Sequence, residues 1–105
     1  MLTTENAIIL SKRFLAELKS NGYNPKEAIL FGSYASGKNS EYSDIDLAIW
    51  DEKFTGCLSV DCKPLLKLLV KYQLLELHSY SLDDTADTNP FIGEIHKNGI
   101  TILAD

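Results

Sequence analysis

The sequence contains only two cysteines, Cys57 and Cys62. A structural zinc site requires four ligands, and the two histidines, His78 and His96, lie at no recognised ligand spacing from the cysteines. We therefore expect reduced thiols with a structural role, and no zinc centre.

Long apolar runs are also missing. Apolar runs such as 68–70 are interrupted by Lys67 and Lys71, and none approaches the roughly 20 residues that a membrane span requires. The N-terminus lacks the basic-then-apolar layout of a signal peptide. We expect no membrane association and a cytoplasmic location.

Positive charge is scarce. Ten Lys and Arg against fifteen Asp and Glu give a formal net charge of −5, which argues against non-specific binding to DNA or RNA. It does not exclude a nucleotide, because Mg²⁺ can carry positive charge into an acidic site. No repeat, low-complexity tract or linker divides the 105 residues, so residues 1–105 are expected to form one domain.

The patterns of apolar, capping and turn residues predict alternating helices and strands. In order, these are a helix from Thr3 or Thr4 to Asn21-Gly22, a strand over 27–31, a turn or short helix over 32–37, a strand over 44–50, a helix over about 61–71 with Pro64 in its first turn, a strand over 73–80, a helix from Asn89-Pro90 to about 98, and a strand over 100–103. This order predicts an α/β (α+β) fold, with a mixed sheet of three or four strands and helices packed against it.

The loop after the first predicted strand permits two phosphate-binding interpretations. Gly32 and Gly37-Lys38 match the P-loop pattern, but Asn39 stands where a P-loop needs Ser or Thr for Mg²⁺. A strand also follows the polar stretch 39–43 at once, instead of a long helix. The second interpretation is a Gly32-Ser33 turn that opens a short helix, where the glycine admits a phosphate and amides bind it. By itself, a Gly-Ser pair is more often simply a loop.

Two aspartates flank Ile45 on the next predicted strand. The period of two places Asp44 and Asp46 on one face and Ile45, Leu47 and Ile49 on the other. Two carboxylates at that spacing can bind a pair of Mg²⁺ ions. A solvated strand face also explains such a pair, but strands disfavour Asp and like charges repel.

Taken together, residues 32–37 (Gly-Ser-Tyr-Ala-Ser-Gly) and 43–47 (Ser-Asp-Ile-Asp-Leu) resemble the signature of the DNA polymerase beta superfamily. Within it, the sequence is similar to the minimal nucleotidyltransferases, which have about this length. The resemblance implies that Gly32 and Ser33 hold a nucleoside triphosphate. It also implies that Asp44 and Asp46 bind two Mg²⁺ and that a later strand supplies a third carboxylate.

The sequence departs from the family pattern at two positions. Ser36 stands where members often carry Arg, and Lys38 is expected to replace that phosphate contact. The third carboxylate, usually Asp, is Glu76, with His78 and Tyr80 on the same strand face. The resemblance makes Glu76 a metal ligand and general base, although an ordinary polar strand residue is the alternative. Asp83 and Asp84 lie beyond the strand and are weaker candidates.

The resemblance implies attack of an acceptor hydroxyl on the α-phosphate, with ATP as donor and pyrophosphate as leaving group. Minimal nucleotidyltransferases are typically paired with an all-helical partner protein encoded nearby, often as antitoxin and toxin, so a tyrosine of that partner is the expected acceptor. The alternative is a non-catalytic binding module that neutralises its partner by contact.

Overall fold

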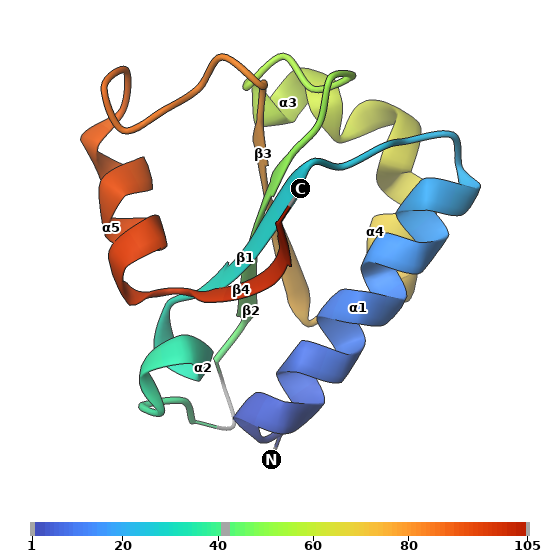
Figure 1. Cartoon of the computed structure of the whole chain (residues 1–105). Helices are drawn as coiled ribbons and strands as arrows, with labels where there is room; N and C mark the ends of the chain where they lie inside the picture. The colour runs from blue at the N-terminus through green and yellow to red at the C-terminus, as the bar shows by residue number, and fades with distance from the viewer. Residues whose placement is uncertain (1, 41–42, 105) are drawn as a thin grey trace.

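The computed structural model describes residues 2–40 and 43–104, and its centre is a four-stranded mixed sheet with helices on both faces (Figure 1). The strands lie in the order β3-β2-β1-β4. β1 pairs antiparallel with both β2 and β4, whereas β2 pairs parallel with β3. The strand bounds are β1 Glu27–Phe31, β2 Ile45–Trp50, β3 Leu75–Tyr80 and β4 Ile100–Ala104. The predicted fold class is confirmed.

Helix α1 (Thr4–Ser20) begins and ends where the sequence predicts. The Thr3 hydroxyl accepts the backbone N–H of Asn6, and the Asn6 side chain accepts the Thr3 N–H in return. This reciprocal capping satisfies two amides that the first turn leaves without a helical partner. Phe14 and Leu18 on one face are fully buried.

The predicted long helix over about 61–71 is wrong, because that segment contains three short helices. They are α3 (Leu58–Asp61), the 3-10 helix η1 (Lys63–Leu65) and α4 (Leu66–Lys71). Pro64 lies inside η1, where it has no N–H to donate and where its ring excludes a regular α-helical turn. The N–H of Leu65 reaches back three residues to the Cys62 carbonyl (2.9 Å), as a 3-10 turn requires.

The two faces of β2 are buried under different helices. Leu47 and Ile49 pack in a cluster with residues of α1 and α4, and Ala48 and Trp50 pack against Ile92 and Ile95 of α5 (Pro90–Asn98). Figure 1 shows α5 on one side of the sheet and α1 with α4 on the other. Asp46 belongs to the α5 side, because it alternates with Ile45 and Leu47.

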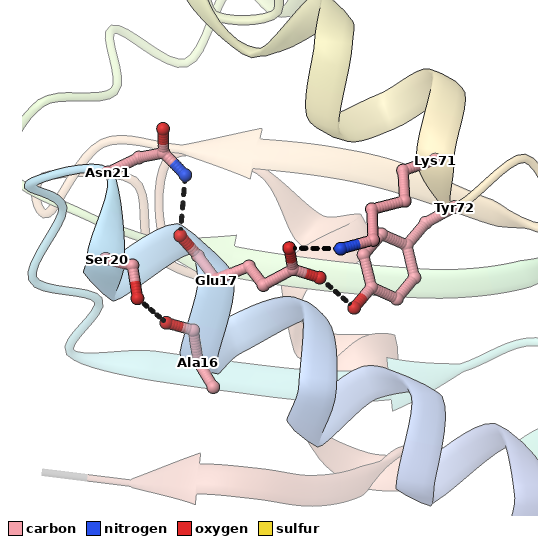
Figure 2. A network of polar contacts seen from close by, with 6 residues as sticks. All are labelled: Ala16, Glu17, Ser20, Asn21, Lys71 and Tyr72. Carbon is pink, nitrogen blue, oxygen red and sulfur yellow. Dashed lines mark hydrogen bonds and ion pairs between the residues drawn. The ribbon is translucent and has the colours of Figure 1, made fainter.

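A polar contact joins α1 to the end of α4 (Figure 2). Lys71 Nζ lies 2.6 Å from Glu17 Oε1, and the Tyr72 hydroxyl donates to Glu17 Oε2. The hydrogen bonds from Lys71 and then from Tyr72 hold the pKa of Glu17 below its usual value. Since the Lys71 side chain is 63% exposed and that of Glu17 is 33% exposed, water screens this contact, which orients the helices but adds little stability.

Two other expectations concern the chain as a whole. Over residues 2–40 and 43–104, none of the helices has the length and apolar character needed to cross a membrane. Cys57 and Cys62 are free thiols. Cys57 is exposed, however, which does not favour the predicted structural role for it.

Candidate active site

Asp46 lies where three strands meet. In the antiparallel pairing its partner is Phe31 at the end of β1, and in the parallel pairing its partner is Glu76 on β3. Directly opposed residues of adjacent strands project to the same face of a sheet. The sheet therefore brings Asp46 and Glu76 together from positions 30 residues apart in the chain.

His78 joins this pair, because it lies two residues after Glu76 and on the same face of β3. Its Nε2 is 3.2 Å from Asp46 Oδ1. One ligand atom from each of Asp46, Glu76 and His78 lies within 4.8 Å of the other two. Asp46 and His78 are half-buried and Glu76 is exposed. Two carboxylates so close together repel each other unless a cation lies between them.

Gly32 follows β1 directly and lies beside this cluster, and its backbone leaves no space for a side chain. Its φ of +79° falls in a region that residues with a Cβ rarely adopt, and a Cβ there would lie 2.5 Å from Asp46 Oδ2. Gly32 therefore lets the chain turn directly against the Asp46 carboxylate. Approach of a phosphate is the reason expected from the sequence for a glycine here, and contact with Asp46 is a second reason.

The turn after Gly32 forms the short helix α2 (Ser33–Ser36), as one of the two predicted alternatives has it. The N–H of Lys38 and the hydroxyl of Ser36 both donate to the Ser33 carbonyl, at 3.0 and 3.1 Å. The Lys38 side chain is exposed. That Ser33 and Lys38 bind a nucleotide stays a prediction.

A cavity of about 440 Å³ opens between this turn and α5. Its walls are mainly apolar and include Phe31 and Phe91, whose rings meet edge to face with centroids 5.7 Å apart. Ser36, Glu94 and Asn98 supply polar groups. Two other hollows of similar volume, about 480 and 410 Å³, occur in the described part of the chain. What distinguishes this one is that Gly32 and Phe31 connect it to the carboxylates.

Asp44 is placed differently from the prediction. The strand begins at Ile45, whose N–H donates to the Leu74 carbonyl (2.7 Å), so Asp44 precedes the paired region. The period-two argument, which put Asp44 on the face of Asp46, applies only to residues within the pleated strand. Asp44 is exposed and does not belong to the group formed by Asp46, Glu76 and His78. Its role as a metal ligand stays a prediction.

The comparison with protein families agrees with this arrangement. A family model described as a nucleotidyltransferase domain matches residues 11–86, a stretch that includes the Gly32 turn, β2 and β3. The chain belongs to the nucleotidyltransferase domain family. No curated protein matches the sequence significantly. The mixed sheet with its helices is consistent with a nucleotidyltransferase fold. Members of this family typically use a divalent metal.

In this nucleotidyltransferase domain, His78 is a candidate site residue that was not predicted from the sequence. The available signal was its position two residues after Glu76, which places both side chains on one face of a strand. That position alone does not reveal the register between β2 and β3, which pairs Asp46 with Glu76 and Ala48 with His78. That register depends on a parallel crossover and cannot be derived from local sequence patterns.

Proposed function

We propose that this chain is a divalent-metal-dependent nucleotidyltransferase that moves AMP from ATP to an acceptor hydroxyl. The observation that carries the proposal is the opposition of Asp46 and Glu76 on paired strands, next to the glycine turn. It occurs within the stretch that matches the nucleotidyltransferase domain family.

The donor atoms fit a divalent ion of the Mg²⁺ type. Oxygen atoms of two adjacent carboxylates are the ligands that Mg²⁺ accepts from proteins, with phosphates and water at its remaining positions. Asp46 and Glu76 would hold one ion between them, and Asp44, which directly precedes β2, is proposed as a further ligand to a second ion. When bound, such ions lower the pKa of a coordinated hydroxyl and offset phosphate charge.

The proposed reaction is a displacement at the α-phosphorus of ATP. The acceptor oxygen forms a bond to that phosphorus, the bond from the phosphorus to the bridging oxygen breaks, and pyrophosphate leaves. Glu76 accepts the hydroxyl proton, which its exposure allows it to pass to water. The Gly32-Ser33 turn and Lys38 hold the triphosphate, and positioning supplies most of the rate.

The cavity beside Gly32 supports a nucleotide as the donor. Its aromatic and aliphatic walls, Phe31, Phe91 and Ile95, suit the flat face of a base, and Glu94 and Asn98 offer polar groups at its edge. Ser36, which stands where family members often carry Arg, also lines this cavity. We therefore assign the base or ribose of ATP to the cavity and the triphosphate to the turn.

For the acceptor, we propose a hydroxyl of a separate protein, with a tyrosine of an all-helical partner encoded nearby as the first candidate. Such a pair would act as antitoxin and toxin in the cytosol. The alternative proposal is a binding module that neutralises this partner without catalysing a reaction. It is favoured by the position of Asp44, which is exposed and does not belong to the group of Asp46, Glu76 and His78.

The test is transfer of label from α-³²P-ATP, with Mg²⁺, to the product of the adjacent reading frame co-expressed with this chain. Labelled partner and released pyrophosphate are expected from the wild type, and neither from Asp46→Asn. Asp87→Asn is the matched control, because it removes one exposed carboxylate in the turn before α5. Wild type that binds ATP and the partner but transfers no label would establish the binding module instead.

The phosphate role of the turn needs its own variant. Gly32→Val is unsuitable, because any Cβ at that position displaces Asp46 and disturbs the metal site as well. Ser33→Ala removes only a hydroxyl, and it should raise the KM for ATP several-fold while the protein keeps its thermal stability. An unchanged KM would place the triphosphate elsewhere.

A further inference from the structure

We propose that His78 is itself a metal ligand, so that this site combines one imidazole nitrogen with two carboxylates and prefers Mn²⁺ to Mg²⁺. The inference rests on the proposed function in one respect only, namely that a divalent ion binds between Asp46 and Glu76. It does not require that the protein transfer a nucleotide.

The spacing of the three donor atoms fits one octahedral ion. At metal–ligand distances of about 2.1 Å, neighbouring ligand atoms lie about 3.0 Å apart and opposite ones about 4.2 Å apart. The Nε2 atom of His78 and the Oδ1 atom of Asp46 are 3.2 Å apart, which corresponds to neighbouring positions. All three donor atoms lie within 4.8 Å of one another, so small side-chain rotations bring Glu76 into the same shell.

The imidazole is already held in this position by its surroundings. His78 is paired opposite Ala48 in the parallel ladder, which fixes its backbone beside β2. Its ring and the ring of Phe31 meet edge to face, with centroids 4.8 Å apart and an interplanar angle of 65°. A ligand whose orientation is fixed before binding loses little conformational entropy when the ion arrives.

A nitrogen donor changes the metal that the site prefers. Mg²⁺ is a hard ion that takes oxygen ligands almost exclusively, whereas imidazole binds first-row transition ions well. Mn²⁺ shares the octahedral geometry and the carboxylate affinity of Mg²⁺. As a first-row transition ion it also accepts an imidazole nitrogen, and it binds such sites more weakly than the later ions of the series. It is therefore the ion that suits both the two carboxylates and the imidazole.

The experiment loads the full chain with MnCl₂, without nucleotide, and records pulsed EPR spectra that detect ¹⁴N coupling to the bound ion. Imidazole coupling is expected in the wild type and lost in His78→Gln, which keeps an amide able to hydrogen-bond Asp46. His96→Gln is the matched control, because His96 lies on α5 and bonds to Glu27, and it should retain the coupling. Competition titrations should show the preference for Mn²⁺ over Mg²⁺ falling about tenfold or more in His78→Gln.

Two results would overturn the proposal. Stoichiometric Mn²⁺ that is lost in Asp46→Asn but shows no ¹⁴N coupling in the wild type would mean that His78 only orients the aspartate. Coupling that persists in His78→Gln would assign the nitrogen to another group. If His78→Gln does not fold, the wild-type and His96→Gln spectra still decide between ligation and its absence. Clear coupling in a protein that transfers no nucleotide would leave this inference standing and refute the proposed function alone.

Discussion

Two consecutive residues of β3 contact two aspartates on opposite faces of the sheet. Ser79 donates to Asp61 (2.8 Å), and His78 lies 3.2 Å from Asp46. The two aspartates have different surroundings: Asp61 is buried among hydrogen-bond donors, whereas Asp46 is half-buried and faces a second carboxylate, Glu76. The comparison shows that the partners of a carboxylate, more than its burial, indicate whether it serves the fold or a site.

Asp61 has the partners that a buried charge needs. Oδ1 accepts the N–H and the hydroxyl of Thr55 at 2.8 and 3.0 Å, and Oδ2 accepts the N–H of Gly56 and the hydroxyl of Ser79. Burial alone would raise the pKa of Asp61, but these hydrogen bonds together outweigh it and hold that pKa below its usual value. Asp61 therefore connects the loop at Thr55 and Gly56, before α3, to Ser79 of β3 through hydrogen bonds.

The largest effect in this comparison is expected from Asp46→Asn. Removing the charge should reduce metal-dependent nucleotidyl transfer by about 10²-fold or more, because the ion loses a central ligand. The free energy of unfolding should stay the same or rise slightly, since the charge repulsion from Glu76 disappears. Rates of label transfer and urea unfolding curves on the same preparation measure both effects. A variant that unfolds easily would show that Asp46 serves the fold after all.

The same substitution at Asp61 should have the opposite outcome. Asp61→Asn turns an amide group toward donors that formerly met a carboxylate oxygen, and should lower the free energy of unfolding by about 2 kcal/mol. Transfer by the folded fraction should be unchanged, because Asp61 lies on the other face of the sheet. Urea unfolding at pH 7 measures the loss, and transfer assays at low temperature test the unchanged rate.

Acid should narrow the difference in stability between the wild type and Asp61→Asn. Because the pKa of Asp61 is lowered in the folded protein, the folded state resists protonation more than the unfolded state does. Its contribution is therefore complete above the unfolded pKa of about 4 and is lost as the pH falls further, toward the folded pKa. Urea unfolding of both proteins from pH 7 to pH 2.5 should show the two curves converging below about pH 4. If the difference in unfolding free energy between the two proteins stays constant over this range, Asp61 is not stabilised as an ionised, hydrogen-bonded carboxylate.

The smallest effect is expected from Glu17→Gln. Glu17 bonds Lys71 and Tyr72 at the surface (Figure 2), where water and salt screen the ion pair. The melting temperature should fall less than in Asp61→Asn, and the fall should shrink in 1 M NaCl. Thermal unfolding at low and high salt measures this. A salt-independent loss as large as that of Asp61→Asn would mean that the contact is effectively buried.

Much of the fold could be predicted from local sequence signals. Thr3 as a cap and Asn89-Pro90 at the start of α5 depend on neighbours within a few residues, and the structure confirms both. The continuous helix over about 61–71 was wrong because its start was misplaced. The prediction put Pro64 in the first turn, where the missing N–H costs little, but the helical segment begins at Leu58, so that Pro64 lies further in and interrupts it.

The candidate site was only partly predictable for a different reason. The facing positions of Asp46 and Glu76 were expected only from the family resemblance, because parallel pairing joins distant segments whose register no local pattern fixes. The position of Asp44 depends on which residue forms the first ladder contact, a one-residue difference that periodicity cannot resolve. The proximity of His78 to Asp46 could be inferred only from the register of β3 with β2.

The long separation between Asp46 and Glu76 also has a kinetic consequence. Phe31 and Asp46 pair across a 15-residue separation, but Asp46 and Glu76 pair across 30. Closing the longer loop costs more chain entropy, so we expect the β1–β2 pair to form early in folding and β3 to dock late. An ion bound between the two carboxylates would then stabilise contacts that are absent from the transition state. Such an ion should slow unfolding while leaving the folding rate nearly unchanged, so that β3 would detach from β2 more slowly in the metal-bound protein.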